Sequence, residues 1–439
     1  MNLDFDYQKT INNLEKRFNF EKKEDSEFDF FKIDRSLKLM DLLGSPNKSN
    51  ALTIHIAGTN GKGSVSSLLS SILSLKYKVG LYSSPHLYQY TERIKINNKD
   101  ISKKDFSKIY NFIEKRILEY EKISGKAFSF FEVLTAMSFI YFKKNKVDIN
   151  VIETGIGGTY DTTNVVKSDI QVITPIGYDH QNVLGDTIKS ISENKAGIIK
   201  ENSTVITSKQ IKEALEIINK KSSEKKSKLI VLNYSLKSKP SIKDLKLNTL
   251  IEVGGNEYNV SSNSIGRHYI DNVALTINTL NHIDKFEITK FQIEKGIRNN
   301  VWPCRGNMKK FKGRIFFIDG AHNESGFNKL ELSIEEFLNK NFTLIFGSNK
   351  NHDIKPVINL IKKFKCRTIL SQSSHPKSEN IENIEKKLKY NRIDYIKSKN
   401  SKEALNISLK ESKINETIIT AGSIFIAAEI SELINNDWL

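Results

Sequence analysis

Residues 55–67 read HIAGTNGKGSVSS, and this stretch decides the fold of the first half of the chain. An apolar run, 51–56, precedes the glycines, and an amphipathic helical pattern follows from Val65. A strand, a glycine-rich turn, a lysine and a hydroxyl at a helix start form an anion site, because backbone N–H groups then point at phosphate oxygens. Lys62 is expected to bridge two phosphates, and Ser64 to cap the helix. The stretch predicts nucleotide binding.

The spacing is not that of the common phosphate loop. Gly58 lies only four residues before Lys62, so G-x-x-x-x-G-K-[ST] is not satisfied and the loop is shorter. Glycines also make tight structural turns. The strand before, the lysine inside and the amphipathic helix after favour nucleotide binding over a structural turn.

Length and composition indicate a folded protein of two domains, with 439 residues, 38% of them hydrophobic and 27% charged. We find no apolar run that could span a bilayer and no signal peptide, so we expect a cytoplasmic protein that does not bind membranes. Cys304 and Cys366 are the only cysteines, which argues against a disulfide framework or a cysteine zinc site. The net charge of +17 would suit nucleic acid, but scattered lysines favour a compositional origin, with attraction of small anions.

Short apolar runs alternate with helical periods from residue 51 onward. This pattern predicts a mostly parallel sheet with both faces covered. The predicted strands are Leu52–Ala57, Val79–Tyr82, Ile149–Glu153, Ile170–Pro175, Thr204–Thr207 and Leu229–Leu232.

The rhythm breaks at residues 246–261, which predict a hairpin with its turn at 254–256. A helix is predicted from His268 to Leu280 and a linker over 296–307. A second, smaller α/β domain follows. Its predicted strands are Ile315–Ile318, Phe342–Phe346, Thr368–Ser371 and Thr417–Thr420, and its predicted helices are Glu324–Leu338, Ile354–Phe364, Glu379–Lys389 and Ile424–Ile434.

Polar residues gather where strands of the first domain end. The stretches are LYSSPHL (81–87), VIETGIGG (151–158), PIGYDHQ (175–181) and ISENKAGIIK (191–200). Ligands bind at these ends of open α/β sheets. Glu153, His180 and Lys195 each have a structural explanation when taken alone. Beside a phosphate loop they predict a magnesium–nucleotide site, because Mg²⁺ takes hard oxygen ligands, and the histidine suggests a second, less demanding metal site.

These motifs together resemble the folylpolyglutamate synthase and dihydrofolate synthase family, within the Mur ligase superfamily and most of all its bacterial bifunctional members. The resemblance runs over nearly the whole chain. It rests on GTNGKGS (58–64), SSPHLYQYTERI (83–94), ETGIGG (153–158), DHQNVLGDT (179–187), KAGIIK (195–200), WPCR (302–305), DGAHN (319–323) and AGSIF (421–425).

The resemblance implies an α/β fold with a Mur-ligase-like, phosphate-loop domain and a smaller Rossmann-like C-terminal domain. The expected boundaries are 1–298, a hinge at 299–307, and 308–439. It also implies an ATP-dependent ligase that joins L-glutamate to 7,8-dihydropteroate and to the γ-carboxylate of reduced folates through an acyl phosphate. Three alternatives stay open: only one of these activities, a peptidoglycan-precursor ligase, and, remotely, a nucleic-acid-binding ATPase.

The resemblance also assigns residues. ATP would be held by Asn60, Gly61, Lys62, Gly63 and Ser64, and from the other side of an interdomain cleft by Asn272, Arg305, Asp319 and His322. Two Mg²⁺ ions, or Mn²⁺, would be bound by Ser84, Glu153 and His180, and Lys195 would be N-carboxylated; a monovalent cation is a further candidate. The pterin would lie near Phe28, Asp29, Phe30, Ser129, Tyr160, Asp161 and Thr162.

Five positions depart from the family pattern. Cys304 stands where glycine is usual, Asn194 where glutamate commonly precedes the lysine, and Glu324 where proline is usual. Thr159 and Gln89 stand where arginine is frequent in the family, both on the expected pterin side, so substrate preference is the property most affected. We expect a monomer without nucleic-acid partners.

Overall fold

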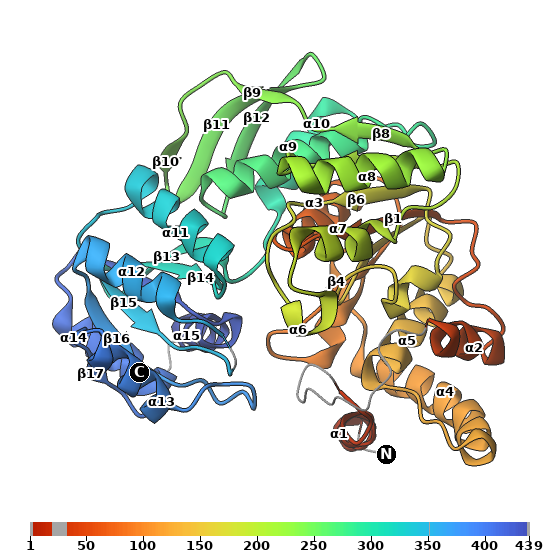
Figure 1. The fold of residues 1–439 in the computed structure, drawn as a ribbon, viewed down its shortest axis with the longest axis horizontal. Helices are drawn as coiled ribbons and strands as arrows, with labels where there is room; N and C mark the ends of the chain where they lie inside the picture. Colours follow the sequence, from red (N-terminus) through yellow and green to blue (C-terminus); the bar gives the residue numbers. More distant parts are fainter. Residues whose placement is uncertain (1–2, 20–32, 351, 437–439) are drawn as a thin grey trace. The chain divides into compact units, whose positions relative to one another are not determined.

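The computed structural model describes residues 3–19, 33–350 and 352–436 (Figure 1). The chain forms two compact units that interleave along the sequence. The first comprises Met1–Tyr234 and Asn272–Gly296, and the second Ser235–Asp271 and Ile297–Leu439. The expected domain boundaries at 298 and 308 concern contiguous stretches and stay a prediction. Within the described residues, no helix is both long and apolar enough to cross a membrane.

An eight-stranded sheet forms the centre of the first unit, in the order β4-β3-β2-β5-β1-β6-β7-β8. Strands β2, β5, β1, β6, β7 and β8 are parallel, whereas β3 and β4 add an antiparallel edge. The bounds are β1 Leu52–Ala57, β2 Val79–Tyr82, β3 Ile94–Ile96, β4 Lys99–Asp100, β5 Ile149–Glu153, β6 Ile170–Ile173, β7 Thr204–Thr207 and β8 Lys228–Val231. The predicted mostly parallel sheet is confirmed.

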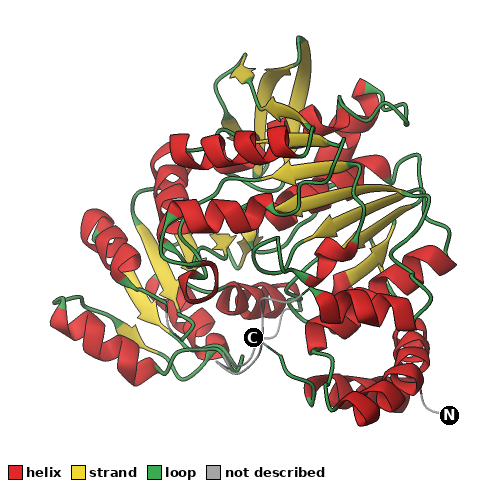
Figure 2. Ribbon diagram, turned by 45° about the vertical axis from the view of Figure 1, so that its right-hand side comes forward, coloured by secondary structure: helices red, strands yellow, loops and turns green. Residues whose placement is uncertain are grey.

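The central strands are buried along their whole length. Every residue of β1, β2, β5 and β6 is buried, as expected for parallel strands covered on both faces (Figure 2). Strand β1 pairs with β5 in a register that places Ile56 opposite Glu153. The phosphate loop and Glu153 therefore leave neighbouring strands at the same edge of the sheet.

Some helices of the first unit precede the sheet, others lie between its strands, and α9 and α10 follow it; α9 begins in the second unit and α10 ends there. Their bounds are α1 Leu3–Glu15, α2 Asp34–Leu42, α3 Lys62–Leu73, α4 Lys103–Ser124, α5 Phe130–Lys144, α6 Gln181–Leu184, α7 Ile188–Ala196, α8 Lys212–Glu224, α9 Arg267–Leu280 and α10 Lys290–Asn299, with short 3-10 helices η1 Tyr90–Arg93 and η2 Thr162–Val165. Helix α3 packs on β1, β2 and β5.

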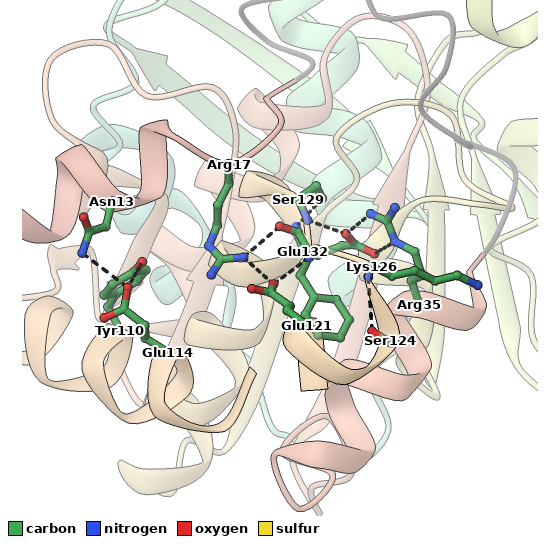
Figure 3. A network of polar contacts seen from close by, with 11 residues as sticks. Asn13, Arg17, Arg35, Tyr110, Glu114, Glu121, Ser124, Lys126, Ser129 and Glu132 are labelled. Carbon is green, nitrogen blue, oxygen red and sulfur yellow. Dashed lines mark hydrogen bonds and ion pairs between the residues drawn. The ribbon is translucent and has the colours of Figure 1, made fainter. Parts of the chain in front are cut away.

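Ion pairs hold the N-terminal helices against α4 and α5 (Figure 3). Arg17 donates to the Glu121 carboxylate at 2.7 Å and to the carbonyl of Phe128 at 3.0 Å. Arg35 of α2 pairs with Glu132 of α5. Both glutamates are largely buried, so each carboxylate is neutralised within the helical layer.

The second unit contains a small antiparallel sheet, which confirms the predicted hairpin. Strands β11 and β12 pair from Leu247–Ser262 to Val253–Asn256, and Gly254 and Gly255 form the turn with positive φ. The bounds are β9 Tyr234–Leu236, β10 Ser241–Lys243, β11 Lys246–Val253 and β12 Asn256–Ser262.

A six-stranded sheet forms the rest of the second unit, in the order β13-β14-β18-β15-β16-β17. Only β13 is antiparallel to its neighbour. The bounds are β13 Arg305–Phe311, β14 Arg314–Asp319, β15 Phe342–Phe346, β16 Arg367–Leu370, β17 Ile396–Lys397, β18 Thr417–Ala421, α11 Glu324–Phe337, α12 Lys355–Phe364, α13 Ile381–Tyr390, α14 Ser401–Glu411 and α15 Ile424–Asn435. The second α/β sheet is confirmed.

The predicted linker at 296–307 is wrong at both ends. Helix α10 continues to Asn299, and β13 begins at Arg305, which pairs with Asp319. Only 300–304 is irregular. Polar side chains in this stretch looked like a loop, whereas backbone pairing with β14 decides the strand.

Candidate active site

The phosphate loop is a backbone turn that needs its glycines. Gly58 has φ 142°, and a Cβ there would lie 1.9 Å from the Thr174 hydroxyl oxygen. Gly61 has φ 99°, and a Cβ would lie 2.6 Å from Oδ1 of Asn272. Both positions therefore exclude larger residues for steric and conformational reasons. The predicted ATP residues Gly61 and Asn272 thus lie side by side in the first unit.

Two lysines converge on one carbonyl of this loop. The Nζ atoms of Lys62 and Lys195 donate to the carbonyl oxygen of Gly58 at 3.1 and 2.8 Å, and Lys62 also reaches the carbonyl of Thr59 at 3.3 Å. Lys195 is buried in α7. Burial, and secondly the charge of Lys62, lower the pKa of Lys195 to about 7. The amine of Lys195 is therefore partly neutral near neutral pH, a condition for nucleophilic chemistry at nitrogen.

The predicted capping role of Ser64 is wrong. Helix α3 begins at Lys62 with Gly61 as its N-cap residue, and no side chain caps it. Ser64 is the third helical residue and is buried, so it lies too far into the helix to act as its cap. The first turn of a helix, which here includes Gly63, has N–H groups without an intrahelical acceptor, and such groups can bind anions. Asn60 precedes Gly61 in the same turn.

Glu153 ends the buried strand β5 and is itself 3% exposed. Its Oε2 accepts a hydrogen bond from the backbone N–H of Ser84 at 3.2 Å. The two predicted metal residues on β5 and after β2 are thus brought together. A carboxylate beside a hydroxyl side chain supplies the hard oxygen donors that Mg²⁺ prefers.

The loop after Glu153 packs against the helix that carries Lys195. Asn194 accepts from the N–H of Gly158 with Oδ1 at 2.9 Å, and its carbonyl accepts from the Thr159 hydroxyl at 2.9 Å. A Cβ on Gly158 would lie 2.7 Å from the carbonyl oxygen of Lys195. The departures Asn194 and Thr159 therefore meet each other beside Lys195.

His180 lies in the loop after β6, in the left-handed region with φ 49°. Its N–H donates to Asp179 at 3.0 Å, and its ring Nε2 lies 4.0 Å from the same carboxylate. The Thr59 hydroxyl and Gly177 exchange two hydrogen bonds of 3.0 Å, which tie this loop to the phosphate loop.

The described residues contain no cluster of three or more histidine, cysteine or acidic side chains that could hold a metal. Glu153 and Ser84 fit a magnesium site of the kind that uses one or two carboxylates and completes its shell with phosphate oxygens and water. The pairing of His180 with Glu153 in a second metal site stays a prediction.

In the second unit, Arg305 and Asp319 are register partners of β13 and β14. Burial raises the pKa of Asp319, while Arg305 and the N–H of Ala321 act in the opposite direction. His322 donates from Nδ1 to the carbonyl of Gly320 at 2.8 Å, which fixes its ring at the end of β14. Together these groups form a compact polar cluster at a strand end.

Comparison with known proteins places this chain. Residues 56–280 match the Mur ligase middle domain. The Bacillus subtilis dihydrofolate synthase/folylpolyglutamate synthase is 32% identical over 344 residues, which cover 76% of this chain and 78% of that protein. The chain belongs to this family of Mur ligases.

Solved structures of folylpolyglutamate synthases share the fold over the whole chain. The Mycobacterium tuberculosis enzyme, complexed with ADP and AMPPCP, has a TM-score of 0.88 at 24% identity and covers 99% of both chains. The Thermotoga maritima enzyme has a TM-score of 0.82 at 28% identity, covering 99% of this chain and 98% of that one. The expected Mur-ligase fold is confirmed.

Among the residues predicted to lie near a pterin, those that the structure describes contribute to the scaffold. Ser129 caps α5 and exchanges hydrogen bonds with Glu132. Thr162 is buried near Ser36, at 3.4 Å between hydroxyl oxygens, and Tyr160 is 42% exposed. A pterin role for these residues stays a prediction. Phe28, Asp29 and Phe30 lie outside the described residues.

Asp161 is more deeply engaged than the sequence suggested. Its Oδ2 accepts from the N–H groups of Gly155 and Ile156 at 2.9 and 3.0 Å, and Oδ1 accepts from the N–H of Thr163 at 2.9 Å and from the Thr163 hydroxyl. Burial raises the pKa of Asp161, and these hydrogen bonds oppose that rise. The carboxylate shapes the turn after Glu153, whatever else it contacts.

Two of the other departures in this family member are accommodated locally. Cys304 is buried and has φ 60°, in the left-handed region where glycine is the favoured residue. Its carbonyl accepts a hydrogen bond from the N–H of Gly320 at 3.0 Å. Glu324 is the first residue of α11, after Asn323 as N-cap. Thr174, which closes over Gly58, is a residue that sequence reasoning missed; its position directly after β6 was the available signal.

Proposed function

We propose that this ATP-dependent ligase joins the amine of L-glutamate to 7,8-dihydropteroate and to the γ-carboxylate of reduced folates. Membership of the family supports the reaction class, and the B. subtilis relative is named for both activities. The observation that carries the proposal is the convergence of Lys62 and Lys195 on Gly58, beside Glu153 and Ser84. This arrangement brings the Lys62 ammonium, the Lys195 amine and the oxygen donors of Glu153 and Ser84 to one strand edge, where a triphosphate and a carboxylate must meet.

The reaction has two steps. A carboxylate oxygen of the acceptor attacks the γ-phosphorus of ATP; the bond from that phosphorus to the β–γ bridging oxygen breaks, giving ADP and an acyl phosphate. The amine of glutamate then attacks the acyl carbon. The bond from that carbon to the phosphate oxygen breaks, inorganic phosphate leaves, and the nitrogen loses a proton as the amide forms. Both steps join anions, so catalysis depends on positioning and charge neutralisation.

We assign the phosphate contacts to the first unit. The N–H groups of Gly61 and Gly63, with Asn60 and Ser64 around them, face the phosphates, and the Lys62 ammonium neutralises their charge. Asn272, held against Gly61, fixes the turn. Bound Mg²⁺, or Mn²⁺, would screen the phosphate charge, with Ser84 and Glu153 as ligands and His180 at a second ion; a monovalent cation is a further candidate.

We also assign the carboxylated lysine to Lys195. CO₂ adds to a neutral amine, with loss of one proton, and gives a carbamate with one negative charge. The pKa of about 7, set by burial and by Lys62, supports this addition because it leaves a neutral amine at working pH. The carbamate oxygens would attract and orient a metal ion, whereas the ammonium form of Lys195 would repel it.

In the second unit, Arg305, Asp319 and His322 are our candidates for further nucleotide contacts. We place the pterin ring near Ser129, Tyr160 and Thr162. The enzyme works as a monomer without nucleic-acid partners in this proposal.

The deciding experiment incubates purified protein with ATP, glutamate and either dihydropteroate or tetrahydrofolate. We expect ADP release with each acceptor and a product heavier by one glutamyl residue. ADP release with only one acceptor would end the bifunctional proposal. Release with a peptidoglycan precursor, or stimulation by DNA or RNA, would support the rival functions instead.

A further inference from the structure

His55 is a buried histidine that the reaction does not use. It lies inside β1, three residues before Gly58, and its side chain is 0% exposed. Its Nε2 lies 2.8 Å from the hydroxyl oxygen of Thr163, and its buried Nδ1 has no hydrogen-bond partner among the residues that the structure describes. An apolar residue would fill this place without leaving a nitrogen unsatisfied, so the histidine calls for an explanation.

The hydrogen-bond directions follow from the neighbours. The Thr163 hydroxyl donates to Oδ1 of Asp161, so its lone pairs face His55. The Nε2 atom of His55 must then be the donor, which makes His55 the Nε2–H tautomer. The order of donation runs from His55 through Thr163 to Asp161.

This relay ends at the turn that follows Glu153. Asp161 receives the N–H groups of Gly155 and Ile156 on its second oxygen. A Cβ on Gly155 would lie 3.2 Å from that same oxygen, so backbone and carboxylate are in close contact. Since Ile56 is the register partner of Glu153, the relay connects neighbouring strands just below the residues proposed to meet phosphate and metal.

We propose that His55 and Thr163 are positioning residues, which act through Asp161 to hold the turn after Glu153 and thereby set the affinity for the divalent cation. The inference rests on the proposed role of Glu153 as a metal ligand. A hydrogen-bonded carboxylate ligand with a fixed backbone turn binds metal more tightly than one whose turn is free to move.

The test compares pairs of variants that differ in one feature. Thr163→Val removes the hydroxyl at nearly constant volume, and Thr163→Ser keeps it. In His55→Asn the side chain is too short for its amide to reach the Thr163 hydroxyl. The longer side chain in His55→Gln restores an N–H donor near the Nε2 position. Thr279→Val is the matched control, because Thr279 is buried and its hydroxyl bonds only within α9, to the carbonyl of Leu275.

Two readouts separate this inference from the proposed function. One is the free Mg²⁺ concentration that gives half-maximal ADP formation with saturating substrates. The other is direct Mn²⁺ binding, followed by loss of the free-ion electron paramagnetic resonance signal, which needs no turnover. We expect Thr163→Val and His55→Asn to weaken both by about tenfold, and Thr163→Ser, His55→Gln and Thr279→Val to stay within about twofold of the parent chain.

The double variant His55→Asn with Thr163→Val should bind Mn²⁺ no more weakly than Thr163→Val alone, because Thr163→Val already removes the hydrogen bond that His55 makes. Unchanged Mn²⁺ binding in Thr163→Val and His55→Asn would overturn the relay. Equally weakened Mn²⁺ binding in His55→Asn and His55→Gln would also overturn the relay. These two variants test the relay on their own if Thr163→Val does not fold. Absence of ADP formation by the parent chain would refute the proposed function and leave the Mn²⁺ comparison intact.

Discussion

Arg17 and Arg35, near the N-terminus, face carboxylates, whereas Lys62 and Lys195, in the same unit, share the carbonyl oxygen of Gly58. Burial lowers the pKa of Arg17, but the adjacent Glu121 outweighs it and the net pKa is raised. Lys195, by contrast, donates to the carbonyl of Gly58, and its pKa falls to about 7. The first arrangement is electrically complete, and the second gains from an added anion. We therefore expect the second arrangement, and not the first, to take part in the reaction.

Removal of Lys62 should have the largest effect. Lys62→Ala deletes the ammonium that we expect to neutralise the phosphates, and we predict a loss of about 100- to 1,000-fold in kcat for ADP formation with the fold intact. Lys76→Ala is the control, because Lys76 lies just beyond the same helix and pairs with Glu287 at the surface. Steady-state kinetics and a thermal melt measure the two outcomes; parent-like turnover would remove the phosphate-loop assignment.

Lys195→Ala should come next, with a loss of about 100-fold in kcat, because the group proposed to orient metal disappears. Acetate or formate at high concentration should restore part of the activity by supplying the missing carboxylate. The measurement is ADP formation with and without the added acid. A variant as active as the parent chain without added acid would contradict the carboxylated-lysine assignment.

For the Arg17–Glu121 ion pair we predict that mutation changes stability only. Glu121→Gln leaves Arg17 buried beside a neutral amide, and we expect about 2 kcal/mol less stability in urea unfolding. Glu119→Gln, an exposed position on the same helix, should have no measurable effect. At a temperature well below unfolding, both variants should keep the parent kcat; a loss of turnover in Glu121→Gln would end the distinction between the two regions.

The pH dependence of stability gives the smallest and sharpest test. The pKa of Lys195 is about 7 in the folded chain and 10.5 when unperturbed, so between these values the unfolded chain binds a proton that the folded chain lacks. Stability should therefore rise with pH across this window, by about 1 kcal/mol per unit, and Lys195→Met should lose that contribution. Urea midpoints at pH 7.5 and 9, in CO₂-depleted buffer, measure it; equal slopes in both chains would refute a depressed pKa.

Local sequence predicted most of the parallel sheets, because buried strands and amphipathic helices carry strong periodic signals. The phosphate loop was found from glycines and one lysine. The helix was expected to follow Ser64 as its cap, whereas α3 begins at Lys62 after Gly61. Strand β13 was missed because its pairing with β14 is decided by register, not by composition. The residue spacing favoured nucleotide binding over a structural turn but did not indicate a reaction. The reaction came from the resemblance to a known family.

What could not be read from the sequence is the meeting of distant residues. Nothing local indicates that the Lys195 amine reaches Gly58 across 137 positions, or that Thr174 covers that glycine. The buried chain from His55 to Asp161 is equally invisible, because threonine and aspartate beside a 3-10 helix look like ordinary capping residues.

The interleaving of the two units has a practical consequence for dissection of this enzyme. Cutting after Tyr234 would strip away residues 272–296, and with them Asn272 beside the phosphate loop and Gly296, whose backbone closely approaches Ile72. A contiguous N-terminal fragment would thus expose the back of helix α3 and lack part of its own nucleotide cradle. Expression of half-length pieces should yield aggregated material, and a working minimal ligase would need a circularly permuted gene or co-expressed segments.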